Sequence, residues 1–109
     1  MRRYRQRSAE EARLVGAAEP DARIDPVTLF GRRAPLRLEI GFGHGRFLSQ
    51  LAAAHPAEDF LGVEAKDLRV TKTAHKSLQL QAHNIRLFTG EAHAFVREAL
   101  PSGCLHRCY

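Results

Sequence analysis

LRLEIGFGHG, residues 36–45, is the stretch that decides the fold. Its first half alternates apolar and charged side chains, which is the two-residue period of a β-strand. Its second half holds a glycine at every other position, and such a turn uses backbone conformations that only glycine adopts at little cost. Residues 46–54 then place apolar side chains on one face of a predicted helix, which ends at His55-Pro56. The sequence therefore predicts a strand, a glycine-rich turn and a helix, the first unit of a parallel α/β sheet.

The alternation of strand and helix continues to residue 109. Apolar runs predict two more strands at 59–64 and 84–89, and the start of a fourth at 104–109. Apolar periodicity predicts helices over 66–81 and 91–100. Strands joined by helices run parallel, and the helices cover both faces of the sheet. The predicted fold is an α/β, incomplete doubly wound sheet of three strands plus the start of a fourth, which lies beside the first.

Residues 1–33 differ from the rest of the chain in composition. They contain eight arginines and five acidic residues and show little apolar periodicity. We interpret them as a basic N-terminal arm with one short helix near residues 8–17, and residues 34–109 as the domain. The whole chain has 17 Lys and Arg against 12 Asp and Glu, a net charge of +5. This excess fits a polyanionic partner such as RNA or DNA, and it fits solubility alone equally well.

The sequence argues against membrane-spanning, secreted and metal-binding proteins. No apolar run approaches the ~18 residues of a membrane span, and no apolar region follows the basic start MRRYRQRS as in a secretory signal. Glu10 and Glu11 break the acid-poor pattern of a mitochondrial presequence, so we expect a cytoplasmic protein. Cys104 and Cys108 with His106 between them match no zinc spacing, and we expect no metal.

Acidic side chains stand where predicted strands end, and ligands of such sheets bind at that edge. Glu64 ends the second strand, 19 residues beyond Gly45. A carboxylate at this position accepts hydrogen bonds from ribose hydroxyls, and the alternative is a solvated charge at a strand end. Glu91 comes just after the third strand.

Glu39 is an acid within an apolar strand, and a buried carboxylate without a partner is unstable. A cationic ligand group would explain it, and so would a nearby arginine or the backbone amides of the glycine turn. That turn has the spacing G-x-G-x-G, whereas the dinucleotide fingerprint G-x-G-x-x-G needs a glycine where Arg46 stands. The turn therefore favours a ligand with no phosphate to cradle, although a tight turn with no ligand has the same sequence.

Three segments, LRLEIGFGHGRFL, FLGVEA and NIRLFTGEA, together resemble the bacterial tRNA (guanine-N7-)-methyltransferases over residues 36–109. The resemblance implies a Rossmann-like class I methyltransferase domain, here only part of one, and the cofactor S-adenosyl-L-methionine. The family usually has Asp or Asn where Glu91 stands. The implied contacts are Glu39 with the loop of Gly41 and Gly43 at the methionine end, Glu64 at the ribose, and Glu91 with Ala92 at the adenine.

The implied reaction is methylation of N7 of a guanine in the tRNA variable loop. Guanine N7 has a free lone pair, so the reaction requires alignment with the methyl donor rather than removal of a proton. In the family, catalysis depends on an acid that follows the fourth strand, and this acid is expected beyond Tyr109. No residue of this chain is therefore assigned a catalytic role, and the chain is expected to be a fragment that is inactive alone.

Two other functions remain open on the sequence. One is an NAD-type nucleotide-binding domain of an oxidoreductase, against which Arg46 argues. The other is a non-catalytic RNA-binding α/β module. RNA contacts are expected from the N-terminal arginines, whereas the basic face of the predicted helix 66–81 is interpreted as solvated. The residues of that basic face are Arg69, Lys72 and Lys76.

Overall fold

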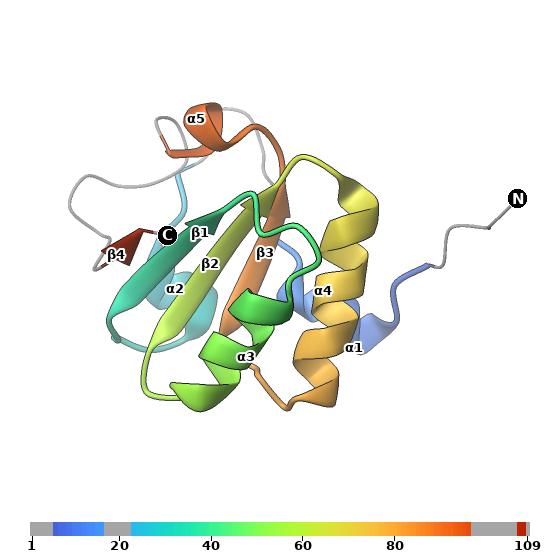
Figure 1. Cartoon of the computed structure of the whole chain (residues 1–109). Helices are drawn as coiled ribbons and strands as arrows, with labels where there is room; N and C mark the ends of the chain where they lie inside the picture. The colour runs from blue at the N-terminus through green and yellow to red at the C-terminus, as the bar shows by residue number, and fades with distance from the viewer. Residues whose placement is uncertain (1–5, 17–22, 97–106, 109) are drawn as a thin grey trace, which may run out of the picture.

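The computed structural model describes residues 6–16, 23–96 and 107–108. Four parallel strands form one sheet in the order β3-β2-β1-β4 (Figure 1). The strand order reverses between β1 and β4, and this is the switch point of a doubly wound, Rossmann-like sheet. The predicted parallel sheet is confirmed, and so is the place of the fourth strand beside the first. The strands are β1 (Leu36–Ile40), β2 (Asp59–Glu64), β3 (Ile85–Thr89) and β4 (Arg107–Cys108).

Helices cover both faces of the sheet, as predicted. On one face lie α1 (Ala9–Leu14), α3 (Arg46–Ala54) and α4 (Asp67–Gln79), and on the other lie α2 (Pro26–Phe30) and α5 (Ala92–Ala94) (Figure 1). The central strand β2 is buried along its whole length, as expected for a strand that is covered on both sides.

An apolar cluster fills each of the two interfaces between sheet and helices. On the α3 and α4 face, Leu48 and Val70 pack with Phe60 of β2, and all three are fully buried. On the opposite face, Phe30 of α2 packs against a cluster that includes Leu61 of β2. Alternate residues of one strand thus serve two cores, which is the two-residue period read from the sequence.

Helix bounds differ slightly from the predicted ones. The helix predicted over 66–81 begins one residue later, because Lys66 is its N-cap, and it ends at Gln79. The helix predicted over 91–100 is described only at its start, where Glu91 is the N-cap rather than a helical residue, because residues 97–106 lie outside the described part of the chain. For the same reason the predicted strand 104–109 is described at residues 107 and 108 alone.

The described parts of the segment 1–33 are packed against the domain. Leu14 of α1 belongs to the core on the α4 side. Val15 pairs in parallel with Leu87 of the edge strand β3, and Gly16 N donates to Leu87 O at 2.8 Å. Pairing at this edge shields strand hydrogen-bonding groups that would otherwise be free to pair with another chain. The short predicted helix is confirmed, and the described residues 6–16 of the predicted basic arm pack on the domain.

Sequence reasoning missed the second helix of that segment, α2. Its signals are present: Asp25 caps the N-terminus, Pro26 occupies the first turn, and Gly31 ends the helix at a φ of +73°. Proline at the start and glycine after the end are the usual boundaries of a helix. With only five residues, the helix is too short to show apolar periodicity.

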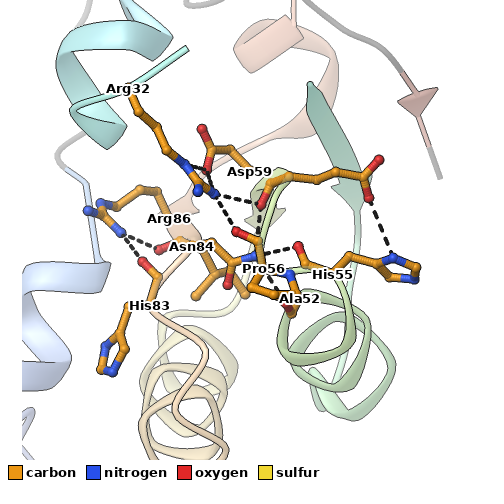
Figure 2. A network of polar contacts seen from close by, with 10 residues as sticks. Arg32, Ala52, His55, Pro56, Asp59, His83, Asn84 and Arg86 are labelled. Atoms are coloured by element: carbon orange, nitrogen blue, oxygen red, sulfur yellow. Dashed lines mark hydrogen bonds and ion pairs between the residues drawn. The ribbon is translucent and has the colours of Figure 1, made fainter. Parts of the chain in front are cut away.

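A polar network ties the elements together at the edge where the strands begin (Figure 2). Arg32 Nη2 donates to Asp59 Oδ1 at 2.6 Å, and its Nε donates to the same oxygen at 3.0 Å. Asn84 Nδ2 lies within hydrogen-bond distance of the carbonyl oxygens of Ala52 and Glu58, at 3.0 and 2.8 Å. These contacts link the end of α3 to the starts of β2 and β3, so the amino edge of the sheet is fixed by internal bonds.

Arg86 extends the network on β3. Its guanidinium lies 5.1 Å from the centre of the Phe30 ring and donates to the carbonyl oxygens of His83 and Ile85. Burial lowers the pKa of Arg86. A cavity at this edge is lined in part by Arg32 and Asp59, which are bonded to each other. Because the polar groups of these two residues bind one another, we assign them a structural role.

Candidate functional site

The carboxyl ends of three adjacent strands form the candidate site. In the register of the sheet, Ile40 lies beside Val63, and Glu64 lies beside Thr89. The ladder continues past the strand ends, because Gly41 N donates to Val63 O at 2.8 Å and Gly90 N donates to Glu64 O at 3.0 Å. The segments that carry the predicted site residues Glu39, Gly41, Gly43, Glu64 and Glu91 therefore meet at one edge of the sheet.

Near the glycine turn, Glu39 and Thr73 each carry a buried side-chain oxygen with no hydrogen-bond partner among the described residues. The side chain of Glu39 is half-buried, and its unpartnered oxygen is Oε2. Burial raises the pKa of this carboxyl above its ordinary value of 4.5. Of the two structural explanations that the sequence left open for this acid, an arginine or the amides of the turn, neither partners that oxygen within the described chain. A cationic ligand group would satisfy it.

The glycine turn uses its three glycines in two different ways. Gly41, Gly43 and Gly45 all have a positive φ, between +59° and +73°. A Cβ atom at Gly41 or Gly43 would have no atom within 4 Å, so the space next to them is open. A Cβ atom at Gly45 would collide with the side chain of Thr73 on α4. The first two glycines thus leave the turn accessible to a ligand, and the third allows close packing of α4.

Glu64 is held rigidly at the end of β2. It is 6% exposed, so the alternative of a solvated charge is wrong. Its Oε2 accepts a hydrogen bond from Lys66 N at 2.6 Å, and its Oε1 lies 3.6 Å from Arg69 Nη1. The start of α4 therefore fixes the carboxylate in one orientation, which is what a ligand-binding acid requires.

Glu91 caps the N-terminus of α5 with its side chain. Its Oε1 accepts from His93 N and its Oε2 from Ala94 N, both at 2.8 Å. The residue is exposed and follows Gly90, whose amide is bonded to Glu64 O. Both carboxylate oxygens thus cap a helix, which leaves the backbone of this segment as the more available donor for a ligand.

Several contacts near the site were not predicted from the sequence. Asp67 Oδ1 accepts from Thr89 Oγ1 at 2.9 Å and also binds Arg7 Nη2. Lys76 Nζ donates to His44 O at 2.9 Å, in the glycine turn. The basic face of α4 is therefore not simply solvated, because Arg69 and Lys76 both contact the site. Their partners are distant in sequence, so no local pattern signals these contacts.

The described chain shows neither a metal-binding cluster nor a membrane-spanning helix. Within residues 6–16, 23–96 and 107–108, no three His, Cys, Asp or Glu side chains are grouped so that they could hold a metal ion. The helices of that same part are too short or too polar to cross a bilayer. The candidate site is built from carboxylates and from the backbone of the glycine turn.

Comparison with known proteins identifies the family of the chain. A family model described as "Putative methyltransferase" matches residues 33–109. A tRNA (guanine-N(7)-)-methyltransferase of Methylococcus capsulatus is 40% identical over 92 residues, which are 82% of this chain and 38% of that protein. A protein of the same name from Thermotoga maritima is 36% identical over 79% of this chain and 28% of its own length. Another, from Cutibacterium acnes, is 43% identical over 69% of this chain and 27% of its own length. Since the family model covers more than half of the chain, this protein belongs to the methyltransferase family that includes the tRNA (guanine-N7-)-methyltransferases.

Proposed function

We propose that this chain binds S-adenosyl-L-methionine at the carboxyl edge of its sheet, as part of a cytoplasmic tRNA (guanine-N7-)-methyltransferase. The observation that carries the proposal is Glu39 Oε2, which is buried without a hydrogen-bond partner in the described part of the chain, two residues before an open glycine turn. S-adenosylmethionine has an ammonium group and a sulfonium, and a cation of this kind offsets the cost of burying a carboxylate. The residues present therefore fit this cofactor.

The proposed contacts divide the cofactor among three strand ends. Glu39 and the backbone of Gly41 and Gly43 would hold the methionine end. Glu64 would accept hydrogen bonds from the ribose hydroxyls, and its fixed orientation supports this role. The segment of Glu91 and Ala92 would contact the adenine. The cofactor supplies an activated methyl group when bound.

The chain's own residues would act by binding and alignment. Guanine N7 needs no proton removed before it attacks, so holding donor and acceptor in line accounts for most of the rate gain. No residue of this chain is assigned as the catalytic acid. The proposed role of the chain is to place the methyl donor at the edge where an RNA base has access.

The proposed RNA partner is supported by the basic residues of the N-terminal segment and by the relatives of this chain. The relatives are tRNA methyltransferases, and the first seven residues include four arginines. The last of these, Arg7, is anchored to Asp67 and Thr71 at the start of α4, next to the site. Basic residues near this edge would contact RNA phosphates, and such binding weakens steeply as salt rises.

Calorimetric titration with S-adenosylhomocysteine and, separately, with NAD tests the cofactor. We expect binding of S-adenosylhomocysteine, whose ammonium group can pair with Glu39, and no binding of NAD. Binding of NAD alone would favour an oxidoreductase domain. Binding of neither ligand, with RNA binding retained, would favour the non-catalytic RNA module. Either of these two results would overturn the proposal.

A further inference from the structure

Helix α4 contacts the glycine turn through Lys76 and Thr73. Lys76 Nζ donates to His44 O, at the centre of the turn, at 2.9 Å. Three residues earlier on the helix, Thr73 packs where a side chain at position 45 would lie. Residues three apart share one face of a helix, so this face of α4 lies against the turn.

The contact between α4 and α3 confirms which way this face points. Ser77 Oγ lies 3.1 Å from Ser49 Oγ of α3, and both residues are fully buried. Since α3 begins directly after the glycine turn, Lys76 sits where the two helices and the turn meet. Lys72 lies one turn earlier on the same helix, but it is exposed and makes no hydrogen bond or ion pair within the described chain.

Backbone bonds close the turn and anchor its two ends, and the Lys76 contact adds a support at His44 between them. Gly45 N donates to Phe42 O at 3.0 Å, Gly41 N donates to Val63 O at 2.8 Å, and Ser49 N donates to Gly45 O at 2.9 Å. Glycines lose more conformational freedom on ordering than other residues do, and three of them here have a positive φ. A loop that is already ordered binds its ligand more tightly, because binding then loses less conformational entropy.

We propose that Lys76 is a positioning residue that keeps the glycine turn in its ligand-binding conformation by holding the His44 carbonyl. It is not a catalytic residue, and its effect passes through the backbone of the turn. The link to cofactor affinity rests on the proposed function, in which this turn holds the methionine end of S-adenosylmethionine.

Three variants of the full chain separate this role from charge and from stability. Lys76→Met removes the donor and the charge, and Lys72→Met removes the same charge without the contact. Lys76→Arg keeps both the charge and a donor. Two properties are measured for each: affinity for S-adenosylhomocysteine by calorimetry, and backbone ¹⁵N relaxation with amide hydrogen exchange of residues 41–45 without ligand. Thermal unfolding shows that each variant is folded.

We expect Lys76→Met to lose about tenfold in affinity, the size of one hydrogen bond with a charged donor, and its turn amides to become more mobile. Lys72→Met should match the unmodified chain, and Lys76→Arg should recover most of the loss. Unchanged turn amides in Lys76→Met would overturn the inference, and so would equal effects of Lys76→Met and Lys72→Met. If the unmodified chain binds no S-adenosylhomocysteine, the proposed function fails, and the ligand-free amide measurements still decide the role of Lys76.

Discussion

Glu39 of β1 lies directly beside Gly62 of β2 in the parallel register of the sheet. Position 62 has no side chain, and a Cβ atom there would come within 2.6 Å of Leu48 and 2.9 Å of Phe42. The place beside the acid is therefore filled by apolar atoms rather than by a polar partner. This packing gives a physical reason for the raised pKa of Glu39 and for the cation that its carboxylate would favour.

The first prediction concerns stability without ligand. Because the folded chain raises the pKa of Glu39, it binds the proton of this group more tightly than the unfolded chain does, and stability falls as pH rises from 4.5 through the folded pKa. Replacing the acid by Glu39→Gln removes the cost of a buried charge. Thermal unfolding at pH 7 should therefore give a higher Tm for Glu39→Gln, and the gain should vanish below pH 4. A lower Tm at pH 7 would show that the carboxylate has a partner.

The second prediction concerns the pH dependence of binding. A cationic ligand favours the ionised form of Glu39, whose pKa is raised in the free protein, so binding should release protons. Affinity for S-adenosylhomocysteine should rise with pH across the range in which this carboxyl titrates. Calorimetry in buffers of different ionisation enthalpy measures the released protons directly. Glu39→Gln should bind more weakly and should release none through this position.

The third prediction separates the glycines of the turn. Gly45→Ala combines a positive φ with a collision against Thr73, and it should cost roughly 2–4 kcal/mol of unfolding free energy. Gly43→Ala has the same backbone strain but open space, and should cost about 1 kcal/mol. Urea unfolding of the two variants makes the comparison. Equal losses would mean that α4 does not pack against the turn as described.

The fourth prediction compares the two acids assigned to ribose and adenine. Glu64→Gln removes the charge of a buried carboxylate that would accept two hydrogen bonds, so affinity for S-adenosylhomocysteine should fall at least about tenfold. Glu91→Asp keeps an acid that is itself a favoured N-cap, so α5 should still begin there and affinity should stay within about threefold. Calorimetry measures both. Similar losses in the two variants would contradict the assignment of ribose and adenine contacts.

Much of the fold was predictable because its signals are local. The alternation in residues 36–40 and the glycines that follow define a strand and a turn without any knowledge of the rest of the chain. The position of Glu64 at the end of the next buried run followed from the same pattern. These features depend on periodicity and on glycine geometry, which sequence expresses directly.

The remaining features depend on contacts between distant segments. Arg7 binds Asp67 across 60 residues, and Lys76 binds His44 across 32, so neither pair leaves a pattern in the sequence. The docking of α1 likewise depends on Leu14 entering a core built from later elements. Composition alone indicated a basic arm, because charge counts do not distinguish a free segment from a packed one.

Mapping the binding of S-adenosylhomocysteine by ¹H–¹⁵N chemical shift changes on the full chain tests the cofactor site most directly. We expect large shifts at the amides of Gly41, Gly43 and Gly90, with little change in the side-chain signals of Arg32 and Asn84 at the opposite edge. Shifts confined to the network of Arg32 and Asn84, or no shifts in the glycine turn, would contradict a cofactor site at the carboxyl ends of the strands.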